Sequence, residues 1–117
     1  MQDFRKLQIW QKSHKLTLDI YKLTKTFPKE ELYGLTSQLR RAGSSIPTNI
    51  AEGCARGSDK DFARFIQIAM DSANETEYLI LLSTELGYMP NDKSKDISKD
   101  LQSLKKMLTS LIKTLTK

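Results

Sequence analysis

The sequence predicts an all-α fold, an antiparallel up-down four-helix bundle that occupies residues 1–117 as a single domain. Three observations support this prediction. Apolar residues recur at three- and four-residue steps through four long segments. The links between these segments are short, and three Pro and five Gly leave little room for long loops. A chain of 117 residues is also long enough to bury one hydrophobic core without disulfides.

The first helix is expected from about Asp3 to Thr26, because the residue before Pro28 disfavours helical geometry. It carries two apolar stripes, which is more apolar surface than a single contact needs. One stripe is formed by Leu7, Trp10, His14, Leu18 and Tyr21, and the other by Ile9, Leu16, Ile20, Leu23 and Phe27. Residues 29–34 (KEELYG) should form a turn, or one turn of helix, that leads into the second helix.

The second helix is expected within Gly34 to Gly57, where an apolar face runs beside an ordered polar row. The apolar face consists of Leu35, Leu39, Ala42, Ile46, Ile50 and Gly53, and the polar row of Gln38, Arg41, Ser45, Asn49, Glu52 and Arg56. Short Ser and Asn beside planar Arg and Gln suit fixed hydrogen bonds to a neighbouring helix. The alternative interpretation is an exposed, solvated face.

Pro47 lies inside this helix, where it removes one backbone donor and presses its ring against the carbonyl of Gly43. We therefore expect the second helix to be kinked at Pro47. Gly43, Ser44 and Ser45 soften the backbone at this point, which favours a bent continuous helix over two separate helices.

The third helix is expected over about Asp59 to Leu86, with Ser58 and Asp61 as a capping pair at its start. Two stripes run along it: Phe62, Ile66, Ala69, Ala73, Thr76 and Ile80 in one, and Phe65, Ile68, Ser72, Glu75, Leu79, Leu82 and Leu86 in the other. The doubled arc predicts either a very central helix or burial against another subunit. Glu75 lies among apolar neighbours, so we expect an ion pair with a cation, and Arg41 is the candidate partner.

Gly87 should end the third helix, and Asn91 or Asp92 should cap the fourth. The fourth helix keeps strict bundle spacing, with apolar residues at alternating steps of four and three. These residues are Ile97, Leu101, Leu104, Leu108, Leu111 and Leu115. Its outer face is rich in lysine.

The charge of the chain is +5 and is concentrated in the first and fourth helices. Residues 1–27 contain six basic and two acidic side chains, and residues 90–117 contain seven and three. As neighbours in an up-down bundle, the two helices would form one basic wall, which attracts polyphosphate by releasing counterions. The candidate nucleic-acid contacts are Lys12, Lys15, Lys22, Lys99, Lys105, Lys106 and Lys113. No motif indicates sequence-specific reading, so binding should be directed to the RNA or DNA backbone.

Several classes of site and location are disfavoured by the sequence. A single cysteine, Cys54, excludes an internal disulfide, and a single histidine, His14, leaves no Cys/His cluster for zinc. There is no Gly-rich phosphate loop and no nucleophile with a base nearby, so we expect no catalytic, metal or cofactor site. No apolar run is long enough to span a membrane, and the N-terminus lacks a signal-peptide core, so we expect a cytoplasmic protein.

The motifs QLRRA (38–42) and SIPTNIAEG (45–53), followed by Arg56, resemble the signature of proteins encoded within 23S ribosomal RNA intervening sequences. The resemblance extends to YGL (33–35), to the Phe27-Pro28 turn and to Ala69, Ser72 and Glu75. Asp71-Ser72 departs from the Gly-Ser that is usual in the family. The resemblance implies a four-helix bundle that assembles into a ring, typically a pentamer, with no established enzymatic activity. Accessory proteins of diversity-generating retroelements are similar in architecture and work with a reverse transcriptase and nucleic acid.

Two non-enzymatic functions therefore stand as hypotheses. The first is an accessory factor, assembled as a homo-oligomer, that binds the backbone of RNA or DNA. The second is a scaffold that docks a protein partner such as a reverse transcriptase. Charge reversal on the basic surface should abolish the first function, whereas changes to apolar surface positions should abolish the second.

Overall fold

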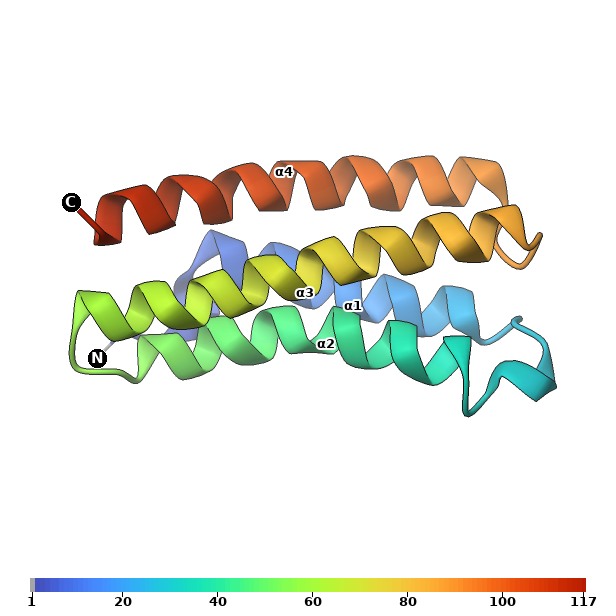
Figure 1. The fold of residues 1–117 in the computed structure, drawn as a ribbon, viewed down its shortest axis with the longest axis horizontal. Coiled ribbons are helices and arrows are strands. Elements are labelled where there is room, and N and C mark those ends of the chain that lie inside the picture. The colour runs from blue at the N-terminus through green and yellow to red at the C-terminus, as the bar shows by residue number, and fades with distance from the viewer. Residues whose placement is uncertain (1) are drawn as a thin grey trace.

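Four long helices, each antiparallel to the one before it, form the protein (Figure 1). This computed structural model describes residues 2–117. The helices are α1 (Gln8–Thr24), α2 (Leu35–Cys54), α3 (Asp59–Glu85) and α4 (Asn91–Leu115), and two 3-10 turns, η1 (Phe4–Lys6) and η2 (Lys29–Glu31), precede α1 and α2. No strand is present in the described part of the chain. The predicted all-α up-down bundle is confirmed, and both chain ends lie at the same end of it.

The hydrophobic core is built from one apolar face of each helix. Its fully buried members include Leu16, Ile20, Leu39, Ile46, Ile50, Ile66, Ile80, Leu101, Leu104 and Leu108. Each residue in this set belongs to a predicted apolar face. Periodicity in the sequence therefore identified the inward side of all four helices.

The start of the first helix differs from the prediction. The chain forms η1, becomes extended at Leu7 (φ −81°, ψ 130°), and α1 begins only at Gln8. The cause is local: a carboxylate oxygen of Asp3 accepts a hydrogen bond from the backbone N–H of Arg5 at 3.1 Å, which caps the 3-10 turn. The turn places the Phe4 ring edge-on against Trp10, with 4.9 Å between ring centroids.

Helix α2 is continuous through Pro47, so the alternative of two separate helices is wrong. The kink at Pro47 stays a prediction. Because proline has no N–H, the Gly43 carbonyl lacks its usual donor four residues later. The Thr17 hydroxyl of α1 lies 3.1 Å from this oxygen and also 2.9 Å from the Ser13 carbonyl. A Cβ atom at Gly43 would lie 2.7 Å from Ile20 Cδ1, so the glycine allows α1 to approach closely.

The ends of α2 and α3 follow simple capping rules. Helix α2 ends at Cys54, three residues before the expected Gly57. Ser58 caps α3 as predicted, because its hydroxyl oxygen accepts from the Asp61 N–H at 3.2 Å. Gly87 ends α3 with φ +82°, a conformation that favours glycine.

The cap of α4 differs from the prediction. Pro90, rather than Asn91 or Asp92, occupies the cap position, and no side chain caps this helix. Proline suits the position because it fixes the backbone before the first turn and its missing N–H would have no partner there.

The loops at the end of the bundle opposite the termini are joined through Glu31. One carboxylate oxygen of Glu31 accepts from the Leu35 N–H at 3.1 Å, at the start of α2, and the other accepts from the Tyr88 hydroxyl at 3.1 Å. The Tyr88 ring also packs against Phe27, with centroids 5.6 Å apart. These contacts connect the α1–α2 link to the α3–α4 link.

Only one of the two apolar stripes on α1 and α3 is in the core. On α3, the stripe through Ile66 and Ile80 is buried, whereas Ile68 and Leu86 of the other stripe are 37% and 49% exposed. On α1, the stripe that includes Leu18 lies at the surface. A single chain therefore leaves apolar side chains of both helices in contact with solvent.

The Thr17 hydroxyl can be tested by replacing Thr17 with Val, which keeps the shape but leaves the buried Gly43 carbonyl without a donor. We expect a loss of about 1–3 kcal/mol in the free energy of unfolding, measured by urea denaturation. The matched control is Thr109→Val on exposed α4, where the hydroxyl contacts only its own helix. That change should cost under about 0.5 kcal/mol. Equal losses in both variants would contradict the assigned role.

Candidate functional site

The polar row on α2 is partly a hydrogen-bonded contact with α3. The Ser45 hydroxyl oxygen accepts from the Ser72 hydroxyl at 2.9 Å and from the Asn49 side-chain amide at 3.0 Å. Asn49 also donates to the Ser45 carbonyl at 2.8 Å. Fixed hydrogen bonds to a neighbouring helix therefore exist at the centre of the row.

The remaining members of the row do not belong to this contact. Gln38, Arg41 and Glu52 are exposed, and so is Glu75 on α3. The predicted buried ion pair between Arg41 and Glu75 is wrong for the single chain, since no such pair forms within residues 2–117. Glu75 lies on the rim of α3, where water solvates its carboxylate, so the charge needs no buried partner.

The departure at Asp71 does not disturb the packing of α3 on α2. The Asp71 carboxylate is exposed and accepts from the Gln67 side chain at 3.1 Å, whereas Ser72 next to it is buried. The helices also approach closely at Gly53, where a Cβ atom would lie 2.7 Å from the Phe62 ring.

The outer face of α4 carries a straight row of exposed lysines, here called the lysine stripe. Its members are Lys95, Lys99, Lys106, Lys113 and Lys117. At 3.6 residues per turn they project within roughly 40° of one another and extend over about 33 Å. None of them forms an ion pair with any residue of the described chain. The stripe is therefore a line of positive charge with no intramolecular neutralisation.

Two of the predicted contact lysines are engaged within the chain. Lys105 is half-buried and donates to Glu77 of α3 at 2.8 Å, and this hydrogen bond holds the pKa of the Glu77 carboxyl below its ordinary value. Lys15 donates to Asp19 at 3.1 Å, which raises the pKa of the lysine. Lys105 is therefore better described as a link between α3 and α4 than as a free contact.

The expected basic wall across α1 and α4 is interrupted by acidic residues. The two helices are neighbours, but Asp19, Asp96 and Asp100 line a cleft of about 290 Å³ between them, together with Lys15, Lys22, Leu23, Lys93 and Ile97. The aspartates of each helix lie on the flank that faces the other helix, where they offset the lysines. Lys12 and Lys22 are exposed but stand apart from the stripe on α4.

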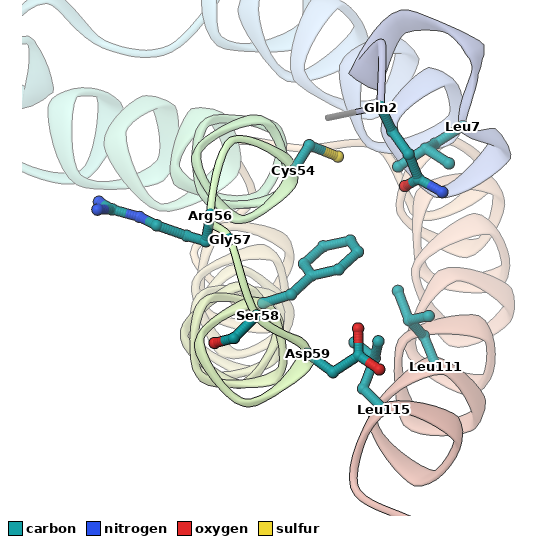
Figure 2. A pocket seen from close by; sticks show the side chains of 10 residues that line it. Gln2, Leu7, Cys54, Arg56, Gly57, Ser58, Asp59, Leu111 and Leu115 are labelled. Carbon is teal, nitrogen blue, oxygen red and sulfur yellow. The ribbon is translucent and has the colours of Figure 1, made fainter.

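Other polar side chains provide little catalytic chemistry. Cys54 is buried, and this burial raises the pKa of its thiol, while His14 stacks on Trp10 with ring centroids 4.7 Å apart. Cys54 lines a cavity of about 410 Å³ at the end of the bundle (Figure 2). Within residues 2–117, no three His, Cys, Asp or Glu side chains are grouped so that they could hold a metal ion. None of the helices described is long and apolar enough to cross a membrane.

Comparison with known proteins places the chain in a family. The model of the 23S rRNA-intervening sequence protein family matches residues 5–110. The chain belongs to this family. A solved structure from Bacteroides thetaiotaomicron, described as a protein with unknown function from the S23 ribosomal protein family, is 30% identical and has a TM-score of 0.81. That match covers 90% of this chain and 98% of the other chain. No curated protein matches the chain significantly.

For this member of the intervening sequence protein family, two lysines of the stripe were not among the predicted contacts. Lys95 and Lys117 share the face of Lys99, Lys106 and Lys113. Helical spacing alone would have found them, because 95, 99, 106, 113 and 117 recur at multiples of about 3.6 residues. Charge counts per segment gave the helix but not the face.

The role of Lys105 predicts a pH dependence of stability. Because the pKa of Glu77 is lowered in the folded state, its contribution is present above pH about 4.5 and is lost as pH falls through the folded pKa. The carboxylate side chain is 41% exposed, so we expect a contribution of at most about 1 kcal/mol.

The measurement is urea unfolding of wild type and Glu77→Gln at pH 6 and pH 3. The variant should be less stable at pH 6, and the difference should disappear at pH 3. Glu85→Gln, at an exposed position of α3 outside the ion pairs described, is the matched control. A difference that persists at pH 3 would show that the ion pair is not its cause.

Proposed function

We propose that the protein is a non-enzymatic, ring-forming accessory factor that binds the phosphate backbone of RNA or DNA. The observation that carries this proposal is the lysine stripe of α4, whose charges are exposed and have no partner in the described chain. A line of cations about 33 Å long neutralises several successive phosphates and releases their counterions.

The chemistry of the stripe favours contacts with the backbone over reading of bases. Lysine is a flexible point charge without the planar fork that recognises guanine. The exposed side chains between the lysines include Gln102, Thr109 and Ser110, which can donate hydrogen bonds to phosphate oxygens. We therefore expect weak sequence preference and strong dependence on salt.

Self-association is supported by the apolar surface of α3. Ile68, Tyr78, Leu81 and Leu86 are between 37% and 60% exposed, an unusual concentration on one helix of a monomer. The resemblance to ring-forming relatives implies a pentamer. A ring repeats the lysine stripe once per subunit, which increases the effective affinity for a long polyanion.

Reversal of three stripe charges tests nucleic-acid binding. We expect Lys95→Glu/Lys99→Glu/Lys113→Glu to weaken binding of a fluorescein-labelled structured RNA strongly. The plot of log affinity against log salt should become shallower by about 2–3, one unit or slightly less per lost phosphate contact per subunit. Fluorescence anisotropy between about 50 and 200 mM salt measures both quantities.

The matched control carries the same change in charge away from α4, at the exposed positions Lys25, Lys29 and Lys60. It should retain more of the affinity and of the salt slope than the stripe variant. Light scattering on each sample establishes whether the oligomer is unchanged. Equal loss in both triple variants would assign binding to net charge and would exclude the stripe as the contact.

The ring can be tested on α3. Replacing Ile68 and Leu86 with Lys should prevent burial of this surface, so the mass measured by light scattering should fall to that of one 13.4 kDa chain. The control introduces two lysines at exposed positions outside α3, Thr26 and Thr109, and should keep the wild-type mass. A monomeric wild type would refute the ring.

The second candidate function, docking of a protein partner, is favoured by a different observation. An apolar cleft lies between the N-terminal residues and α4, away from the exposed surface of α3.

A further inference from the structure

The bundle is open at the end that holds both chain termini. Leu7 and Ile9 face Met107 and Leu111 across a cleft of about 440 Å³, whose other lining residues are Gln8, Lys106 and Ser110. The volume is within the range of about 300–1,000 Å³ that is typical of binding pockets. The exposed lining of the cleft is mainly apolar.

The cleft continues into the cavity at the end of the bundle. Leu7 and Leu111 line both spaces, and Phe62, Leu115 and Cys54 extend the apolar surface inward. In Figure 2, Leu111 and Leu115 of α4 lie on one side of the open space and Cys54 of α2 on the other. The two spaces form a single elongated depression, here called the terminal cleft.

The apolar face of α4 is longer than the core that covers it. Leu104 and Leu108 are fully buried, whereas Met107, Leu111 and Leu115 are only half-buried. The last two turns of α4 thus present apolar side chains that the chain itself does not enclose. Such a surface at a groove between two helices is suited to a third helix, whose anchors recur at i, i+3, i+4 and i+7.

The rim of the terminal cleft is positively charged. Lys106 lines it directly, and Lys6 and Lys12 are exposed within one turn of Leu7 and Gln8. None of these lysines forms an ion pair in the described chain, whereas Asp3, the acidic residue nearest in sequence to Lys6, is paired with Arg5. Unpaired cations around an apolar floor select an occupant with acidic flanks.

We propose that the terminal cleft binds an amphipathic helix with acidic flanks, supplied by another protein. Apolar anchors of that helix would cover Leu7, Met107 and Leu111, and its carboxylates would meet Lys106 and Lys12. Met107 suits this role because its flexible side chain adapts to different anchors. A phosphate backbone cannot cover an apolar floor, so the cleft and the lysine stripe serve different partners. The proposal does not depend on nucleic-acid binding.

The probe is a synthetic fluorescein-labelled peptide with leucines at i, i+3, i+4 and i+7 and glutamates on both flanks. A matched peptide has lysine in place of every glutamate. With the full chain, anisotropy should show binding of the acidic peptide at least about tenfold tighter than that of the basic peptide. Binding should also slow the reaction of N-ethylmaleimide with Cys54, the chain's single cysteine, which lines the cleft.

Two variants locate the binding. Lys106→Glu, at an exposed position that preserves the fold, should weaken the acidic peptide about three- to tenfold, and Met107→Glu should abolish detectable binding. The matched control is Lys99→Glu on the outer face of α4, which should leave peptide affinity unchanged. Met107→Glu should keep the RNA affinity of the wild type, so failure of this proposal and failure of the stripe are separately visible.

Three results would overturn the proposal. The first is equal binding of both peptides, or no binding of either. The second is unchanged affinity of the acidic peptide for Lys106→Glu. The third is a fall in the mass of the protein alone on introducing Met107→Glu, since this would show that a second copy of the chain covers the cleft.

Discussion

The hydrogen bond from Thr17 to the Gly43 carbonyl is the constraint around which the first two helices are arranged. Pro47 deprives that carbonyl of its donor within α2, and a buried carbonyl without a donor is costly. Supplying the donor from α1 requires close approach, which the missing side chain of Gly43 permits. One residue pair therefore fixes both the spacing and the register of α1 against α2.

Helix α4 is positioned in a different way. Its polar contacts with the bundle are made to α3, through Lys105 and Glu77 in the middle and through Thr84 and Ser94 near the loop. Its apolar face fills the core, but its outer face takes part in none of these contacts. The same helix can therefore complete the core and keep a row of unpaired lysines in solvent.

Periodicity predicted the four helices and their buried faces, because burial of one side of a helix leaves a direct record in residue spacing. The cap by Ser58 and the end at Gly87 followed from local backbone chemistry. The Arg41–Glu75 pair was predicted wrongly, because spacing shows that Glu75 shares a stripe with apolar residues but not which flank another helix covers. The basic wall failed for the same reason, since the direction of Asp19 and Asp96 depends on where the neighbouring helix lies.

The two ends of the bundle are secured to different degrees. Glu31 joins both loops at one end, through its bonds to Leu35 and Tyr88, whereas the end with the termini has no such link among the contacts described and contains the cavity. Backbone amides near Tyr88 should therefore exchange with solvent deuterium more slowly than those in the last turns of α4. Thermal opening would begin at the termini, and a helix bound there would act as a removable fifth element that closes the bundle.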